Sequence, residues 1–268
     1  MRRRVGRIAG WAYCVVVLAF LLLPIVIMVP SSFSASDSLQ FPPGVLSLRW
    51  YREVLANGAW LASGWLSLRL ALFAAVVATA AALLVAIAHM RLGGIRPMLR
   101  GFLLLPLVAP HIVLAAGLFS VLLRMHRLGD PVVLALGHAC LAIPLTVVLF
   151  INAADTLDPL LWTAAGSLGA RWPTVLRQVI VPNMIGSVII AFVLAFVVSW
   201  DEVTFAVFIG PTETQTLPAR MYSYLQELIN PSLTAIATLL IAFTAAACLL
   251  GLALQYLRRR APAGTAME

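Results

Sequence analysis

The chain has 268 residues, of which 62% are hydrophobic and only 10% charged, and its formal net charge is +8. A soluble domain needs a charged surface, so this composition excludes an ordinary water-soluble enzyme and predicts a protein of the lipid bilayer. The three cysteines all fall inside apolar stretches without metal-ligand spacing, which indicates packing residues.

The apolar stretches predict an all-α membrane protein that forms one domain over residues 1–268. A membrane-crossing helix needs about 20 mostly apolar residues. Six stretches satisfy this requirement, at residues 11–29, 63–89, 101–123, 132–151, 184–208 and 232–257. We expect the first to be a retained anchor, because its apolar run is longer than the core of a cleaved signal peptide, which is about 7–15 residues.

The basic residues predict the orientation of the chain. All eighteen are arginines, and a cytoplasmic N-terminus followed by six spans places twelve of them in the cytoplasm, five outside and Arg69 within the second span. This asymmetry is the positive-inside pattern of membrane proteins. The positive charge therefore indicates a multi-pass protein with both termini in the cytoplasm, surrounded by the lipid bilayer, and does not predict nucleic-acid binding.

The outer segment between the first two spans, residues 30–61, contains a turn and then a short apolar helix. We expect this helix at Leu46–Leu55, with Trp50 and Tyr51 at the level of the lipid headgroups.

A polar segment at residues 155–182 interrupts the apolar pattern on the cytoplasmic side. Asp158 and Pro159 form a typical helix start, and Gly169 stands where a helix stop needs a left-handed residue. Two apolar stripes at helical spacing lie before and after this glycine. The first is Leu157, Leu160, Leu161, Ala164, Ala165 and Leu168, and the second is Trp172, Val175, Leu176 and Val179. The pattern predicts two short amphipathic helices that bind a partner outside the membrane, or alternatively a helix lying on the inner leaflet.

The spacing of small and apolar residues in this segment resembles the EAA loop of ABC importer permeases. That family has Glu-Ala-Ala, then Gly, then Ile-x-Leu-Pro at the same intervals. The matching positions are Thr163, Ala164, Ala165, Gly169, Val179, Val181 and Pro182. Thr163 replaces the glutamate, which removes a possible ion pair with the ATPase. The resemblance implies a type I ABC importer fold whose cytoplasmic coupling helix docks into a separate ATPase.

Two further motifs resemble the spermidine/putrescine-type permeases. They are Phe41-Pro42-Pro43 with the following Ser47–Tyr51, and Ser199–Glu202 at the end of the fifth span. The resemblance implies a bacterial inner-membrane protein that transports a polyamine. It also implies three kinds of partner, namely two ATPase subunits, a second and paralogous permease subunit, and an external solute-binding protein that approaches residues 30–61 and 211–231.

The absence of lysine bears on the energy source. A phosphate-binding P-loop requires a lysine at a fixed place, so this chain cannot contain one. We therefore expect that the chain is not an enzyme and binds no cofactor, and that ATP and Mg²⁺ sit on the partner ATPase.

The acidic residues near the end of the fifth span are candidates for the solute path. Asp201 and Glu202 lie about 26 Å from the cytoplasmic start of that span, and ionisable residues within a span mark an ion or solute route by default. We expect them to attract a cationic amine, with Trp200 as a cation–π surface. The alternative is an internal ion pair with Arg69. His111, after Pro110, is the second candidate, although a lone histidine on an apolar face is also a common packing residue.

Other functions remain open at this stage. His111 stands where similar permeases carry an acid, which weakens the case for a polycation and leaves an aminophosphonate, an opine or an amino-acid-like solute as the alternative. A secondary transporter normally has two repeated halves, which this chain lacks. An intramembrane enzyme using Ser167 is disfavoured, because no histidine or aspartate lies at a suitable spacing.

Overall fold

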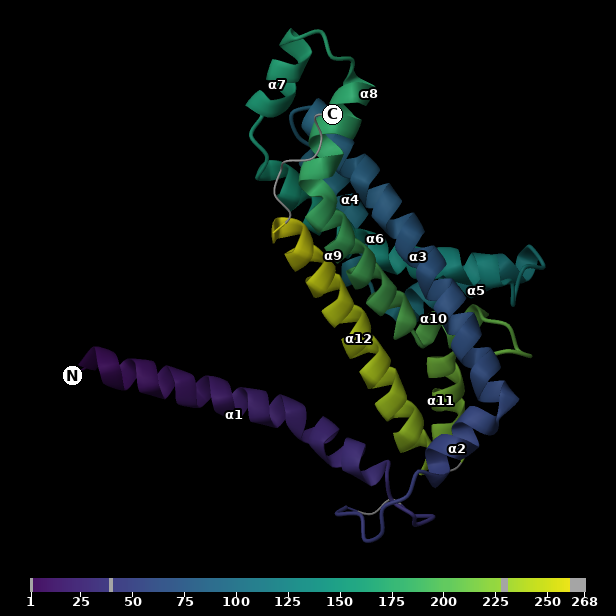
Figure 1. Cartoon of the computed structure of the whole chain (residues 1–268). Helices are drawn as coiled ribbons and strands as arrows, with labels where there is room; N and C mark the ends of the chain where they lie inside the picture. The colour runs from purple at the N-terminus through teal and green to yellow at the C-terminus, as the bar shows by residue number, and fades with distance from the viewer. Residues whose placement is uncertain (1, 39–40, 228–230, 261–268) are drawn as a thin grey trace, which may run out of the picture. The chain divides into compact units, whose positions relative to one another are not determined.

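The computed structural model describes residues 2–38, 41–227 and 231–260. Within these ranges the regular elements are helices, and one isolated bridge pairs Ser34 with Leu46. The helices are α1 (Arg2–Ser31), α2 (Arg49–Ala56), α3 (Gly58–Arg91), α4 (Pro97–Val108), α5 (His111–Arg124), α6 (Pro131–Asp155), α7 (Leu160–Ser167), α8 (Trp172–Val175), the π-helix η1 (Leu176–Ile180), α9 (Val181–Trp200), α10 (Thr204–Ile209), α11 (Leu217–Glu227) and α12 (Ser232–Arg260) (Figure 1). The predicted all-α fold class is confirmed.

The chain divides into two compact units. Unit 1 comprises Met1–Leu61 and Met221–Phe243, and unit 2 comprises Ala62–Arg220 and Thr244–Glu268. Helices α3, α11 and α12 each run continuously from one unit into the other. Every residue that the sequence nominates for coupling or for the solute path lies in unit 2.

Unit 1 contains α1 and the outer segment with α2. The apolar part of α1 is exposed throughout, as expected for a helix whose surroundings are lipid. The helix predicted at Leu46–Leu55 is present as α2, beginning at Arg49. Trp50 is buried within the protein, with the Arg49 guanidinium 4.7 Å from its ring centroid, and its placement at the headgroup level stays a prediction.

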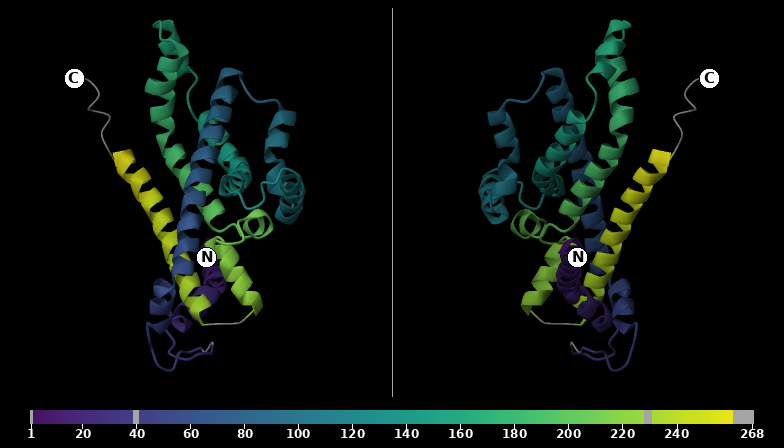
Figure 2. Two further views of the ribbon diagram at one scale, coloured as in Figure 1. Left: turned by 90° about the vertical axis from the view of Figure 1, so that its right-hand side faces the viewer. Right: turned by 90° about the vertical axis from the view of Figure 1, so that its left-hand side faces the viewer.

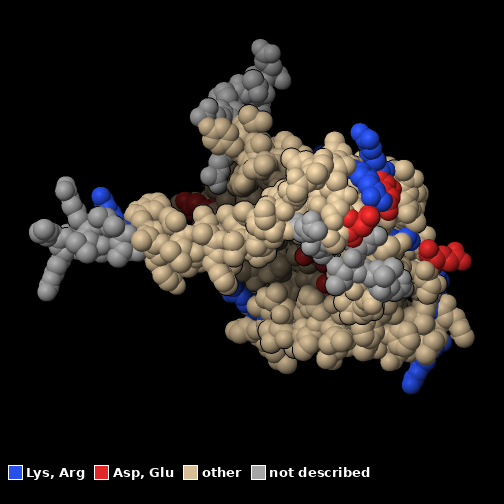
Figure 3. Space-filling view, turned by 90° about the horizontal axis from the view of Figure 1, so that it is seen from below, with Lys and Arg blue, Asp and Glu red and all other residues tan. Residues whose placement is uncertain are grey.

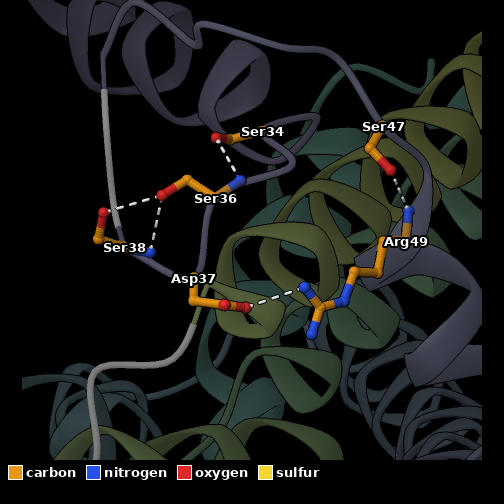
Figure 4. Close-up of polar contacts among 6 residues, drawn as sticks. All are labelled: Ser34, Ser36, Asp37, Ser38, Ser47 and Arg49. Carbon is orange, nitrogen blue, oxygen red and sulfur yellow. Dashed lines mark hydrogen bonds and ion pairs between the residues drawn. The ribbon is translucent and has the colours of Figure 1, made fainter.

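Polar contacts order the loop between α1 and α2. The carboxylate of Asp37 pairs with the guanidinium of Arg49 at 3.0 Å, and the hydroxyls of Ser36 and Ser38 share a hydrogen bond of 2.9 Å (Figure 4). Nearer α1, the hydroxyls of Ser32 and Tyr51 are 2.6 Å apart. These contacts connect the end of α1 with the start of α2 and give the outer segment a defined shape.

Unit 2 is built on α6 and α9, which pack together and against residues 62–91 of α3 (Figure 2). Small buried side chains on α3 allow the neighbouring helices to approach closely, as is usual in membrane bundles. They are Ala71, Ala74, Ala75, Ala78, Ala82 and Ala86.

Two clusters of buried side chains stabilise unit 2. We call the first cluster, which includes Leu134, Phe205 and Ile209, the α10 core. We call the second cluster, which includes Phe150 and Met184, the loop core. Gly137 of α6 faces the first of these clusters, and a Cβ there would lie 2.8 Å from the Phe205 ring, so α10 rests directly on the α6 backbone.

Five helical runs in the described part of the chain are long and apolar enough to cross a membrane. They are Gly10–Ser31, Gly58–Arg91, Pro131–Asp155, Trp172–Trp200 and Ser232–Leu257. The pair α4 and α5 would make a sixth span if counted as one. Most of the surface in the view of Figure 3 belongs to uncharged side chains, in keeping with this arrangement.

The third span differs from the continuous helix predicted at residues 101–123. It is broken between α4 and α5, and the two halves are bent by 95°. The residue before a proline is driven out of the helical region, and Ala109 accordingly has φ −71° and ψ 135° before Pro110.

The fifth span also differs from its predicted limits of residues 184–208. It ends at Trp200, and it begins at Trp172 because α8, η1 and α9 form one continuous run. Pro182 lies in the first turn of α9 and does not stop the helix. Its ring would crowd the carbonyl four residues earlier in a regular α-helix, and the wider turn of η1 at that point accommodates it.

The start of α6 is set by a side-chain cap. A carboxylate oxygen of Asp130 accepts the N–H of Val132 at 2.9 Å, and the other pairs with Arg127 at 2.9 Å. The Val132 N–H, together with the Arg127 guanidinium, holds the pKa of the Asp130 carboxyl below its ordinary value. This cap begins the helix that carries one wall of the candidate site.

Candidate functional site

A close contact between the side chains of His111 and Glu202 joins two helix breaks in unit 2. His111 is the first residue of α5, and Glu202 lies between α9 and α10. Nδ1 of His111 is 3.3 Å from Oε2 of Glu202, and the two side chains are 46% and 7% exposed. The other carboxylate oxygen of Glu202 accepts the N–H of Phe205 at 3.1 Å. The two residues were separate candidates in the sequence, and the structure brings them into contact.

Both breaks expose backbone polar groups within an otherwise apolar region. Irregular backbone at membrane depth is tolerated where it is buried in protein or lines a water-filled passage. Here α10 and α5 pack on each other in the α10 core, and the Glu202 carboxylate takes one of the free N–H groups of α10. The meeting point of the breaks is therefore a polar site held by a rigid apolar core.

Asp201 and Trp200 lie beside this site in different environments. Asp201 follows the last turn of α9, is exposed, and forms no ion pair with another described residue. Trp200 is 5% exposed and stacks on Phe196 at 5.8 Å between ring centroids, so one face of its ring is already covered. Asp201 is thus the accessible carboxylate, and the cation–π role of Trp200 stays a prediction.

The alternative ion pair with Arg69 is not present among the described residues. The Arg69 guanidinium lies 5.7 Å from the ring centroid of Trp65. Both residues line a cavity of about 460 Å³ that Glu213 also lines. Glu202 has His111 as its ionic partner instead.

A buried histidine beside this contact, His138, was not among the candidates from the sequence analysis. Nδ1 of His138 forms a 2.9 Å hydrogen bond with Oγ of Ser199, one turn before Glu202. His138 is 1% exposed, and its Nε2 has no hydrogen-bond partner in the described part of the chain. Its position inside an apolar helix was the available signal, because an ionisable residue within a span is itself uncommon.

The polar segment forms a hairpin whose first arm is α7 (Figure 1). The helix begins at Leu160, whose N–H donates to the carboxylate of Asp158 at 2.9 Å. It ends at Ser167, and Gly169, two residues later, has φ +82°. The N–H of Gly169 donates to the Gly166 carbonyl and that of Ala170 to the Ala165 carbonyl, at 2.9 and 3.0 Å. This pair of bonds is the Schellman stop that favours glycine at this position.

The first apolar stripe divides between the protein and the surface. Ala165 and Leu157 pack against the loop core, whereas Leu160 and Leu168 are 69% and 89% exposed. Ala164 is exposed as well, and the Thr163 hydroxyl donates to the carbonyl of Pro159 at 2.9 Å. The α7 helix therefore presents an apolar surface that nothing in the described chain covers.

The second arm of the hairpin is continuous with the fifth span. Val175 and Ile180 are buried in the loop core, and Val179 packs against it. Pro182 is exposed. A displacement of this arm would pass directly into α9, whose far end carries Asp201 and Glu202.

No group of three or more His, Cys, Asp or Glu side chains in the described ranges is arranged to hold a metal ion.

Comparison with known proteins decides the family. Residues 86–261 match the family described as "Binding-protein-dependent transport system inner membrane component". The chain belongs to this family. The matched region includes the helix breaks, the α7 hairpin and all candidate site residues, and this multi-pass inner-membrane protein is a permease subunit of an ABC importer. The family implies an ATPase and a solute-binding protein as partners.

Two curated relatives are polyamine permeases by name. The spermidine/putrescine transport system permease protein PotC of Haemophilus influenzae is 29% identical over 237 residues, which cover 88% of this chain and 91% of the relative. The putrescine transport system permease protein PotI of Escherichia coli K12 is 28% identical over 262 residues, covering 94% and 92%.

Two solved structures share the fold. The MetNI methionine ABC transporter in inward-facing conformations matches with a TM-score of 0.63 at 16% identity, covering 78% of this chain and 97% of the other. A bacterial ABC transporter involved in the import of the acidic polysaccharide alginate matches with a TM-score of 0.63 at 15% identity, covering 94% and 96%. The predicted type I importer fold is confirmed.

Proposed function

We propose that this permease forms half of the translocation path for a polyamine such as spermidine or putrescine, and that a separate ATPase drives it through the α7 hairpin. The observation that carries the proposal is the acidic site where the two helix breaks meet, with Asp201 exposed and Glu202 buried behind it. A carboxylate at such a place attracts a cationic amine. The names of the PotC and PotI relatives support the same class of solute.

The coupling role is supported by the exposed surface of α7. An apolar patch on a cytoplasmic hairpin favours a protein partner, and small residues such as Ala164 let a second backbone approach closely. Thr163 carries no charge, so docking at this helix depends on shape and apolar contact. ATP and Mg²⁺ would bind the partner ATPase, because the chain has no lysine for a P-loop.

The assembly that we propose contains two ATPase subunits, this permease, a paralogous second permease and an external solute-binding protein. The binding protein would contact the outer segment of unit 1 and residues 211–231, of which 228–230 lie outside the described residues. Both chain termini would be cytoplasmic, although residues 261–268 also lie outside the described ranges. The chain itself would have no enzymatic activity.

A second class of solute is favoured by one observation. His111 already pairs with Glu202, and a protonated His111 would reduce the negative charge that a polycation meets. A solute with both an amine and an acidic group, such as an aminophosphonate, an opine or an amino acid, would tolerate this arrangement.

Uptake into proteoliposomes tests the proposal. The complex of this chain, its partner permease and the ATPase is reconstituted with the cognate binding protein, and ATP-dependent uptake of labelled putrescine and spermidine is measured. We expect uptake that requires ATP and all four components, with unlabelled polyamines competing better than aminophosphonates or amino acids. Competition only by amino-acid-like solutes would overturn the polyamine assignment. ATP-independent uptake by this chain alone would instead indicate a secondary transporter.

A further inference from the structure

The α7 hairpin has two stems, which are the end of α6 at Asp155 and the start of α8 at Trp172. The C-terminal end of α3 contacts the first stem through His89. Nε2 of His89 is 2.8 Å from a carboxylate oxygen of Asp155, the last residue of α6. Nδ1 of the same ring is 3.2 Å from the backbone nitrogen of Ile95. The Ile95 N–H is a donor, so Nδ1 accepts and Nε2 carries the hydrogen that is donated to Asp155. One imidazole thus connects the end of α6 with the turn after α3.

The same end of α3 contacts the second stem through Arg91. Its guanidinium carbon lies 5.2 Å from the ring centroid of Trp172, the first residue of α8. This distance is within the range of cation–π attraction. His89 and Arg91 therefore contact Asp155 and Trp172, the residues at the two ends of the exposed hairpin that includes α7.

Apolar packing alone does not fix the direction of this hairpin. Met90 and Ile95, in the same region of the chain as His89 and Arg91, pack against the loop core that includes Phe150 and Met184. Contacts of this kind are non-directional, whereas a hydrogen bond and a cation–π contact depend on geometry. Two directional contacts, one on each stem, restrain rotation of the hairpin relative to α3.

We propose that His89 and Arg91 are positioning residues that make α3 move with the α7 hairpin when the ATPase acts on it. The inference rests on the proposed coupling function of that hairpin. Without these contacts, a displacement of α7 would pass into α6 and α9 alone, and α3 would lag behind. The expected defect is thus in the amount of solute moved for each ATP hydrolysed, while binding of the ATPase persists.

Paired variants isolate each contact. His89→Gln keeps a donor near the Nε2 position and preserves the Asp155 contact, whereas His89→Asn keeps an acceptor for Ile95 and is too short to reach Asp155. Arg91→Lys keeps the cation, and Arg91→Gln removes it. Arg100→Gln is the control, because Arg100 is exposed on α4 and its side chain forms no hydrogen bond, ion pair or cation–π contact with another described residue.

The measurement compares ATP hydrolysis with uptake in the reconstituted complex. We expect His89→Asn and Arg91→Gln to lower the uptake per ATP by about two- to tenfold, the range that one such contact contributes to an equilibrium. His89→Gln, Arg91→Lys and Arg100→Gln should stay near the unsubstituted complex. Co-purification of the ATPase and the melting temperature should be the same for all variants.

Three results would overturn the inference. The first is an unchanged uptake per ATP in both His89→Asn and Arg91→Gln while the unsubstituted complex is coupled. The second is an equal defect in the Gln and Asn variants of His89, which would indicate a general packing role. The third is an unsubstituted complex in which this permease neither binds an ATPase nor stimulates it, and only that result would also refute the proposed function.

Discussion

At the scale of single residues, the carboxylate of Glu202 has two separate roles. One oxygen caps α10 through Phe205, and the other pairs with His111. The cap is a hydrogen bond from an N–H group, which an amide oxygen can also accept, whereas an ion pair with a protonated His111 needs the negative charge. The two roles can thus be separated by one substitution.

Replacement of the acids should impair transport without impairing assembly. Glu202→Gln keeps an acceptor for the Phe205 N–H and removes the charge, and Asp201→Asn removes the exposed charge beside it. Because an interaction with a charged group is worth about 1.5–3 kcal/mol, we expect polyamine uptake to fall by about tenfold or more in either variant. Initial uptake rates and ATPase co-purification would be measured together. Unchanged uptake in both variants would remove the acids from the solute path.

His138 shows how far residue-level interpretation of the sequence reached. Asp201, Glu202 and His111 were selected because charged or titratable groups inside a span are costly. His138 is also a titratable group inside a predicted span, but it was not selected. Only its 2.9 Å bond to Ser199 reveals that it belongs beside the acidic site.

At the scale of secondary-structure elements, the stop of α7 depends on one backbone conformation. Gly169 has φ +82°, and no heavy atom lies within 4 Å of the position that a Cβ would take, so a side chain there meets open space. Any effect of substitution must come from backbone strain. An L-residue in the left-handed region costs about 1–2 kcal/mol, and asparagine tolerates that region best.

Substitutions at two neighbouring glycines test this stop. Gly169→Val should weaken ATPase co-purification by about 5–30-fold, the factor that corresponds to one or two kcal/mol, whereas Gly169→Asn should weaken it less. Gly166→Ala is the matched control, because Gly166 is helical and equally free of neighbouring atoms, so alanine there should be neutral or slightly stabilising. Normal ATPase binding and uptake by Gly169→Val would refute the coupling role of the hairpin.

The helix breaks are the elements that the apolar pattern missed. A run of apolar residues predicts that a segment lies in the membrane, and it contains no information on whether the segment is straight. The break at Ala109 follows from Pro110, a signal that was present in the sequence. The end of α9 at Trp200 was also missed, although the Glu202 carboxylate accepts the N–H of Phe205 only three residues further along the chain.

At the scale of the whole molecule, the proposed orientation in the membrane rests on the arginine distribution and is open to a direct test. The three native cysteines are replaced, and a single cysteine is introduced by Ser167→Cys in the α7 hairpin or by Ser36→Cys in the outer loop. A membrane-impermeant maleimide should label Ser167→Cys only in inverted vesicles and Ser36→Cys only in intact cells, because the positive-inside rule places them on opposite sides. The reverse labelling pattern would invert the proposed topology.

The sequence by itself determined the all-α membrane class, because apolar runs of sufficient length have no other stable solution in lipid. It also indicated the hairpin with its glycine stop, because the helix start, the apolar stripe and the stop are all local in the chain. The tertiary structure alone decided that His111 meets Glu202, that His138 meets Ser199, and that α3 contacts both stems of the hairpin. These partners are far apart in the chain, and the helix packing that brings them together is set by long-range contacts that no local pattern encodes.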